Sequence, residues 1–339
     1  MARLGSVEQV VITARHGELC ARLVADGIPV RPVTWRAGLD PRAFVGVRRE
    51  LARRTSGDPT VIHAHDSHGL ALAAFALAVV ARRGRGFPLV ATRRVTFPVR
   101  PGSWWLRADR VIAVSAAVRD ALVAAGTEGG KVTVVHSGLD LAPREKAGDS
   151  VLRRTLGLPD GTPLASCLAA LTPEKDHRGL LDAAAMLKAT EPSLHWVFIG
   201  DGPLRSTLER HTARVGLTDR VHFVGDRADG ELLLEGSTVM TSSSTAEGFG
   251  TAVLAAMALG IPVVATRVGG LTQLLAGGAG LLVPPRDPGA LADAVGRVLQ
   301  EEVLRESLVR RGRLRAASFS AATMAAGTLA VYRSLVQPH

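Results

Sequence analysis

The segment Ser242–Gly250, SSSTAEGFG, combines a carboxylate with glycines directly before an expected helix that opens at Thr251. Glycines let the backbone approach a ligand closely, and the free N–H groups at a helix start favour phosphate. Glu247 stands at the rim of this turn, where its carboxylate can accept hydrogen bonds from sugar hydroxyls. Alternatively, Glu247 is a helix N-terminal carboxylate stabilised by the helix dipole. The segment therefore indicates either a site for a phosphorylated sugar or an ordinary helix start.

A lysine occupies a comparable place in Leu171–His177, LTPEKDH, which precedes the expected helix Arg178–Thr190. A cation near a helix N-terminus is electrostatically unfavourable by itself. Lys175 makes sense there if it faces an anion, because a pyrophosphate would be stabilised by both the lysine and the helix N–H groups. Otherwise Lys175 is a solvated side chain paired with Glu174 or Asp176.

Three histidines and an aspartate cluster in Val61–Gly69, VIHAHDSHG, at the end of an apolar run. Histidine is a common metal ligand, but His63 and His65 point the same way only while a strand continues, and no other strong ligand cluster is present. A histidine at the carboxyl end of a strand can instead donate a hydrogen bond to a substrate. The residues favour this role over metal binding, and they leave helix capping as an alternative.

Two further pairs carry weaker signals. Arg93 and Arg94 follow an expected strand and could meet a phosphate, although arginines are also common on protein surfaces. Trp104 and Trp105 lie among arginines, so they could touch a membrane interface, or they could pack inside the N-terminal half.

Short β-branched runs alternate with longer alanine- and leucine-rich stretches along the chain. This rhythm predicts an α/β fold in which parallel sheets carry helices on both faces. The expected strands are Val10–Thr13, Val61–His63, Leu89–Thr92, Val111–Val114, Val132–Val135, Leu164–Ala169, Trp196–Ile199, Val221–Val224, Val239–Thr241, Val263–Ala265 and Leu281–Val283.

These elements predict two Rossmann-like, doubly wound domains. The first spans residues 1–142, and the second spans residues 151–318 after a polar linker at 143–150. Residues 319–339 are expected to form a helix that crosses back to the first domain. Ligands bind such sheets beyond the carboxyl ends of the strands, and two facing domains would place the deepest pocket in a central cleft.

Composition and length narrow the class of protein. The chain has 339 residues, of which 47% are hydrophobic, and this is enough for two buried cores. Cys20 and Cys167 form no disulfide or metal pattern, which favours a reducing compartment. The start of the chain carries no secretory signal, and the apolar run Gly69–Ala81 is shorter than the roughly 20 residues that span a bilayer. We therefore expect a cytoplasmic protein.

The formal net charge is +10, and arginines supply nearly all of the basic residues. A basic surface can serve nucleic acid, phosphorylated ligands or an anionic membrane, which would make the protein membrane-peripheral. Arginine-biased codon usage with scattered charge is the alternative. Aromatic residues make up only 4% and do not interleave with a basic run, which argues against nucleic acid.

In combination and in this order, the motifs resemble those of glycosyltransferase family 4, whose members share the GT-B fold. The resemblance covers nearly the whole chain. Its most specific parts are HAHDSH at His63–His68, RADRVIAVSAAVRDAL at Arg107–Leu122, VVHSGLD at Val134–Asp140, LTPEKDHRGLLDAA at Leu171–Ala184, FIGDGPLR at Phe198–Arg205, VHFVG at Val221–Gly225, EGFGTAVLAAMALGIPVVAT at Glu247–Thr266 and GLLVPPRDPGALA at Gly280–Ala292.

The resemblance implies a retaining transfer of a sugar from a nucleotide-diphosphate sugar, with UDP as the expected nucleotide. The acceptor, a lipid-linked or cell-envelope saccharide, would be held mainly by the N-terminal domain. Neither a cofactor nor a metal is implied, and the chain contains no Asp-x-Asp motif of the metal-dependent type.

The resemblance also assigns roles by position. Lys175 would neutralise the leaving pyrophosphate, and Glu247 would bind the hydroxyls of the donor sugar. His65, in preference to His63, would lie near the reacting carbon and donate to the sugar. The other expected donor contacts are the turn residues Gly248, Phe249, Gly250 and Thr251 at the phosphates, and Gly225 at the base.

Three departures from the family pattern concern the donor site and the start of the chain. An arginine is usual five residues before the lysine, where this chain has Ala170, and Arg93 or Arg94 is expected to compensate. A second acidic residue, which holds the ribose hydroxyls, is usual where this chain has Ala255. The chain also opens at what resembles the second strand of the family, so the first strand and its Gly-rich loop are expected to be missing.

These departures define an alternative, a non-catalytic relative that keeps the fold as a binding or partner subunit. The retained Lys175, Glu247 and His65 favour the active enzyme.

Overall fold

The computed structural model describes most of the chain as two compact units. Unit 1 comprises Met1–Val114, Val118–His136 and Ala322–His339, and unit 2 comprises Ser115–Ala117 and Ser137–Ala321. Most of the expected linker, residues 143–149, lies outside the described residues. The described residues are 7–36, 38, 40–53, 59–81, 86–100, 102–140 and 150–336.

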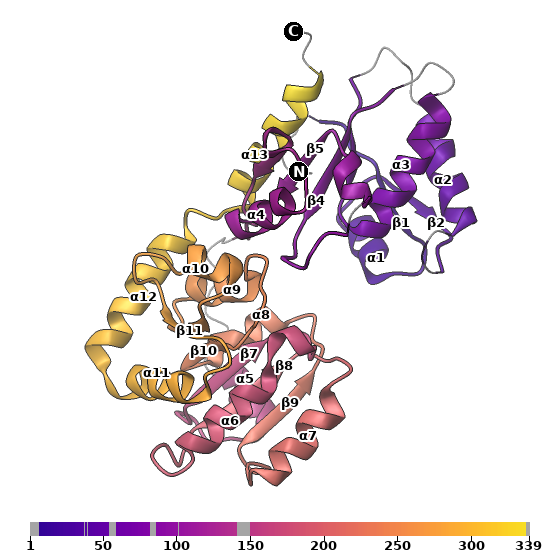
Figure 1. The fold of residues 1–339 in the computed structure, drawn as a ribbon. Coiled ribbons are helices and arrows are strands. Elements are labelled where there is room, and N and C mark those ends of the chain that lie inside the picture. Colours follow the sequence, from indigo (N-terminus) through magenta and orange to yellow (C-terminus); the bar gives the residue numbers. More distant parts are fainter. Residues whose placement is uncertain are drawn as a thin grey trace. The chain divides into compact units, whose positions relative to one another are not determined.

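Unit 1 consists of short parallel strands joined by helices (Figure 1). Strands β1 and β2 pair with each other, and β3 to β6 form a second sheet in chain order. No strand among the described residues joins β1 to β3, and the expected loss of an opening strand stays a prediction. The elements are β1 (Val11–Ala14), α1 (Glu18–Ala25), β2 (Val30–Val33), α2 (Pro41–Ala52), β3 (Ile62–Ala64), α3 (Ser67–Ala81), β4 (Leu89–Arg93), η2 (Trp104–Arg107), β5 (Arg110–Ala113), α4 (Ala116–Ala124), η3 (Gly129–Lys131) and β6 (Val132–Val134).

One layer of helices serves both sheets of unit 1. Apolar side chains of α2 and α3, among them Val47 and Ala76, form a buried cluster. Ile12 of β1 and Ile62 of β3 both pack against this cluster. The two sheets therefore share a core although they share no ladder.

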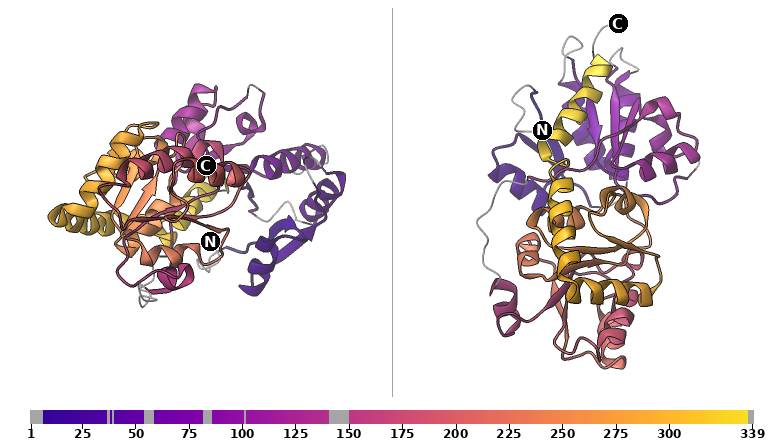
Figure 2. Two further views of the ribbon diagram at one scale, coloured as in Figure 1. Left: turned by 90° about the horizontal axis from the view of Figure 1, so that it is seen from below. Right: turned by 90° about the vertical axis from the view of Figure 1, so that its left-hand side faces the viewer.

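Helix α13 (Ala321–Val336) completes unit 1, although it follows unit 2 in the chain. Its Val331 packs with Val90, Ile112 and Val135, which come from β4, β5 and the residue after β6. Figure 1 and the right-hand view of Figure 2 show α13, in yellow, beside these strands. The helix covers an apolar patch of the larger sheet that would otherwise be exposed.

Unit 2 carries a single six-stranded parallel sheet in the order β12-β11-β10-β7-β8-β9. All side chains of β10 and β11 are buried, as expected for parallel strands that are covered on both faces. The strand order reverses between β7 and β10, so this pair forms the topological switch point. The strands are β7 (Leu164–Leu168), β8 (His195–Ile199), β9 (Val221–Gly225), β10 (Val239–Ser242), β11 (Val263–Thr266) and β12 (Leu281–Val283).

Helices lie on both faces of this sheet. Side chains of α6, α7 and α11 share one large core with the strands, whereas the buried side chains of α9 lie outside that core. The helices are α5 (Ser150–Leu156), η4 (Pro173–Lys175), α6 (His177–Leu187), α7 (Arg205–Arg214), α8 (Gly230–Leu233), η5 (Leu234–Gly236), α9 (Thr251–Leu259), α10 (Gly269–Leu274), α11 (Pro288–Gln300) and α12 (Glu302–Ala316).

The core of unit 2 predicts a contrast between two residues of α6. Leu180 is fully buried, whereas 58% of Met186 is exposed. Leu180→Ala should lower the free energy of unfolding by about 2–5 kcal/mol, because it removes buried methyl groups and leaves a cavity. Met186→Ala should change it by less than about 0.5 kcal/mol. Urea unfolding of both variants checks this, and equal losses would show that the burial of α6 is misassigned.

Candidate active site

Two loops meet at the switch point of unit 2. Lys175 ends η4 in the loop after β7, and Glu247 lies in the loop after β10. The Nζ of Lys175 lies 2.6 Å from Oε2 of Glu247, and the two side chains keep 21% and 18% of their surface exposed. The sequence separates these residues by 72 positions, and the fold makes them an ion pair that a ligand can still reach.

Hydrogen bonds to backbone carbonyl groups hold the two loops together. The Oγ of Ser243 donates to the carbonyl oxygens of Lys175 and Asp176, at 2.8 Å in each case. The backbone N–H of Thr245 donates to the carbonyl of Glu174, also at 2.8 Å. These bonds fix the Lys175 backbone against the Glu247 loop, so the ion pair does not have to position the loops itself.

The turn before α9 presents an uncapped helix start. Gly250 has φ +94°, and a Cβ there would press against Leu271. No side chain caps α9, so the N–H groups of Thr251, Ala252 and Val253 have no partner within the helix, whereas that of Leu254 donates to the carbonyl of Gly250 at 2.9 Å. Phe249 is 2% exposed and packs edge-on against Phe319, which anchors the turn. The arrangement suits phosphate oxygens, as the sequence predicts.

The carbonyl groups of the same turn contact α10. The N–H of Gly270 donates to the carbonyl of Glu247 at 3.0 Å. A Cβ at Gly269 would overlap that oxygen, and a Cβ at Gly270 would overlap the carbonyl of Gly248. Only glycines at these two positions allow the Glu247 loop to lie this close to α10, so they fix the position of the Glu247 backbone against that helix.

A cavity of about 300 Å³ opens beside this turn, at the carboxyl ends of β7 and β8. Gly225 closes β9 at φ +77°, and the next residue, Asp226, belongs to the cavity wall. The lining residues are Leu168, Ala169, Ala170, Ile199, Gly200, Asp201, Asp226, Glu231, Thr251 and Ala252.

His177 is a residue of this region that sequence reasoning does not single out. It opens α6 next to the Lys175 loop, is 1% exposed, and lies against the ring of Phe198. Neither ring nitrogen has a hydrogen-bond partner within the described residues. Burial lowers the pKa of His177 to about 4, with a smaller effect from the charge of Lys175. The imidazole is therefore neutral at neutral pH.

His63 in unit 1 is held from both sides. Its Nδ1 lies 2.6 Å from the hydroxyl of Tyr332, and its Nε2 lies 2.7 Å from Oγ1 of Thr92. Burial lowers the pKa of His63 to about 3, with a smaller effect from His65. Burial also raises the pKa of Tyr332 to about 12. Both ring nitrogens of His63 are engaged, so the predicted contact with substrate rests on His65.

His65 and Arg94 lie exposed after β3 and β4, at the same edge of the sheet. The His65 ring lies 4.1 Å from the His63 ring, and no hydrogen bond engages it within the described residues. Desolvation lowers the pKa of His65, and the Arg94 charge lowers it further. His65 is thus a neutral, accessible imidazole, which fits the predicted role as a donor to sugar.

Arg93 and the tryptophans form packing contacts. Arg93 is 6% exposed, donates to the carbonyl of Phe97, and lies 5.1 Å over the ring of Trp105. Trp105 is buried, and Trp104 packs against Phe75 at 4.5 Å. This favours packing over membrane contact for both tryptophans, and of the arginine pair only Arg94 is free to meet a ligand.

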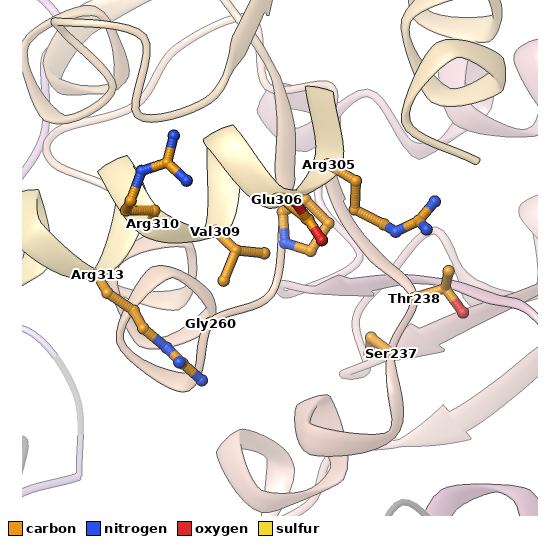
Figure 3. Close-up of a pocket in the computed structure, with 9 residues that line it drawn as sticks. Ser237, Thr238, Gly260, Arg305, Glu306, Val309, Arg310 and Arg313 are labelled. Carbon is orange, nitrogen blue, oxygen red and sulfur yellow. The ribbon is translucent and has the colours of Figure 1, made fainter. Parts of the chain in front are cut away.

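A larger hollow of about 630 Å³ lies at the opposite edge of the sheet of unit 2, before β10 and β11 (Figure 3). Three arginines of α12 line it, and two of them have structural partners. Arg305 donates to the carbonyls of Val298 and Leu299 at the end of α11, and Arg313 donates to that of Leu259 at the end of α9. Part of the positive charge of the chain therefore stabilises helix C-termini.

The described residues contain no group of three or more His, Cys, Asp or Glu side chains that could hold a metal ion. No helix in the described ranges has the length and apolarity that crossing a membrane requires.

Structural comparison defines the class of protein. The chain superposes on the crystal structure of Anabaena HepE in complex with UDP-glucose with a TM-score of 0.83. The match covers 96% of this chain and 92% of HepE, at 25% sequence identity. The fold is GT-B, as the sequence predicts.

Family models identify the chain more closely. Residues 1–143 match the model of Glycosyltransferase Family 4, and residues 149–315 match that of Glycosyl transferases group 1. Together the matches extend over nearly the whole chain, which belongs to glycosyltransferase family 4.

Two named relatives show what similar proteins do. A D-inositol 3-phosphate glycosyltransferase of Corynebacterium urealyticum is 35% identical over 185 residues, which is 51% of this chain and 44% of the relative. A Bacillus subtilis relative, TuaC, whose name refers to teichuronic acid biosynthesis, is 32% identical over 45% of this chain and 37% of its own length. The chain spans about half the length of the curated relatives it matches, or less.

The environment of His63 predicts how stability depends on pH. Its pKa is about 3 in the folded protein and about 6.5 when exposed, so below pH 6.5 the unfolded chain binds a proton that the folded chain does not. Unit 1 should therefore lose stability as the pH falls from 6.5 towards 3. His63→Gln should reduce this acid dependence, although it also lowers stability at neutral pH. Thermal unfolding from pH 7.5 to 4 checks this, and parallel curves would rule out a buried neutral His63.

Proposed function

We propose that the chain is a retaining glycosyltransferase that moves a sugar from a UDP-sugar to a saccharide of the cell envelope. The observation that carries the proposal is the Lys175–Glu247 pair beside the uncapped start of α9. A cation, a carboxylate and free N–H groups are the three kinds of partner that a sugar diphosphate needs. The named relatives support a phosphorylated or envelope-type acceptor.

The resting ion pair explains how this site remains satisfied without substrate. Each side chain is about four-fifths buried, and an unpaired charge at that depth would be costly. On donor binding, Lys175 would exchange Glu247 for the diphosphate, and Glu247 would accept hydrogen bonds from the sugar hydroxyls. Both charges thus keep partners in both states.

The same groups would lower the barrier to transfer. The bond from the anomeric carbon to the diphosphate oxygen weakens in the transition state, and negative charge gathers on the leaving group while the sugar becomes oxocarbenium-like. The Ser243 hydroxyl holds the backbone of Lys175, and Phe249 anchors the turn before α9, so in this proposal both groups would face that charge before it develops. In this proposal the neutral imidazole of His65 keeps its predicted role as a hydrogen-bond donor to the sugar.

Two substitutions test the site directly. Lys175→Ala and Glu247→Ala should each lower transfer at least roughly tenfold, or about 1.4 kcal/mol of barrier, while unfolding remains cooperative. Lys188→Ala is the matched control, because the ammonium group of this exposed lysine, just after α6, donates to the carbonyl of Gly216 at 2.7 Å, away from Glu247. Turnover like that of the wild type in either site variant would show that the site lies elsewhere.

A nucleotide screen tests the donor before an acceptor is known. UDP and UDP-sugars should raise the melting temperature of the purified protein, whereas GDP, ADP and CMP should raise it less, because binding only to the folded state stabilises that state. A cooperative melt that no nucleotide shifts would contradict the proposal and favour the non-catalytic alternative, which the alanines at 170 and 255 also favour.

We further propose that transfer needs no metal ion, because Lys175 and the start of α9 supply the positive field for the diphosphate. Transfer should therefore keep at least about half its rate in EDTA. A loss that Mg²⁺ or Mn²⁺ restores would contradict this part of the proposal and leave the rest intact.

A further inference from the structure

The cavity beside α9 contains a carboxylate with no assigned task. Three acidic residues, Asp201, Asp226 and Glu231, line this space of about 300 Å³. Its wall also includes Thr251, the first residue of α9. A molecule whose phosphates lie on the α9 start would therefore extend into the same space, so the acidic wall faces whatever follows the phosphates.

Asp201 is already engaged. Its Oδ1 accepts from the N–H of Gly202 at 2.7 Å, and its Oδ2 lies 3.0 Å from Nη1 of Arg205. The hydrogen bond from the Gly202 N–H, followed by that from Arg205, lowers the pKa of this carboxyl. Arg205 also bonds Glu209 and the carbonyl of Phe223. Both oxygens of Asp201 thus already accept a hydrogen bond within the protein, which fixes this carboxylate beside Arg205.

Glu231 and Asp226 remain available. Both are exposed, and within the described part of the chain no hydrogen bond or ion pair engages either carboxylate. Glu231 lies on α8, which packs against α9, whereas Asp226 lies on the loop after β9. Glu231 therefore stands on a helix that contacts α9, and its side chain is longer than that of Asp226.

The α9 helix itself offers no such acceptor. No residue of α9, Thr251–Leu259, is acidic, and Ala255 is 4% exposed and has no polar side-chain atom. A vicinal diol in this cavity would donate two hydrogen bonds, and the two oxygens of one carboxylate can accept both. The cavity supplies that carboxylate from α8.

We propose that Glu231 binds the 2′- and 3′-hydroxyls of the donor nucleoside. The carboxylate that selects ribonucleotides would thus come from α8 and not from α9. This inference rests on the proposed function, because it requires a nucleoside diphosphate in unit 2. Glu231 is a binding residue in this scheme and takes no part in bond breaking.

The test pairs a missing carboxylate with a missing diol. Calorimetric titration would measure the dissociation constants of UDP and 2′,3′-dideoxy-UDP for the wild type and for Glu231→Ala, Glu231→Gln and Asp226→Asn. If the nucleotide screen selects guanine or adenine, GDP or ADP and its dideoxy form would replace the uridine pair. Wild type should prefer UDP by roughly tenfold or more, as expected for hydrogen bonds to a charged group. Glu231→Ala should bind UDP about as weakly as it binds the dideoxy form. Glu231→Gln should fall between, and Asp226→Asn should resemble wild type.

The outcomes separate this inference from the proposed function. Wild-type discrimination that persists in Glu231→Ala, or that disappears in Asp226→Asn instead, would overturn the role of Glu231 while leaving the donor site intact. Failure of the wild type to bind any nucleoside diphosphate would overturn the proposed function, and this inference with it. Unchanged melting temperatures of the unliganded variants would confirm that the losses concern binding and not folding.

Discussion

Everything at the candidate site depends on two parallel neighbours, β7 and β10, ending at the same edge of one sheet. Their pairing brings Ser243 under the carbonyls of Lys175 and Asp176, and those hydrogen bonds join the loops into one surface. The αL conformation of Asp176, at φ 47°, lets η4 turn directly into α6. Lys175, Glu247 and the uncapped start of α9 then lie together. Lys175 comes from the loop after β7, whereas Glu247 and α9 both follow β10.

The electrostatics of this surface follow from its being partly, not fully, buried. In a dry interior the Lys175–Glu247 pair would contribute little, because the cost of removing both charges from water can exceed their attraction. At the surface it would be screened and weak. With about a fifth of each side chain exposed, the pair lies between these two limits, and in the proposed function it would be exchanged for the diphosphate. Such groups need no reorganisation when charge develops.

Sequence patterns locate most strands but not their partners. The apolar runs at β7, β10 and β11 are unambiguous because those strands are buried on both faces. Strand β2 gives no such pattern and is absent from the expected strands, since Arg31 and Pro32 leave it short, half exposed and without apolar alternation. Contacts between distant positions are equally invisible: Tyr332 reaches His63 across 269 positions.

At the candidate site, too, the sequence predicts which residues carry chemistry but not which residues lie beside them. Residue types and spacing mark Lys175, Glu247 and the turn before α9, because helix starts have recognisable chemistry. They give no signal for His177 or Glu231, which look like ordinary helix-start residues. Burial and a shared cavity wall distinguish these two, and both properties exist only once the chain is folded.

Because α13 belongs to unit 1 and follows unit 2 in the chain, the order of synthesis differs from the order of assembly. Val90, Ile112 and Val135 leave the ribosome long before Val331, which covers them. Unit 2 has a hydrophobic core of its own and can fold while translation continues. Unit 1 is therefore synthesised first and completed last, and a ribosome that stalls before α13 would release a protein in which unit 2 is folded while unit 1 still exposes the face of a sheet.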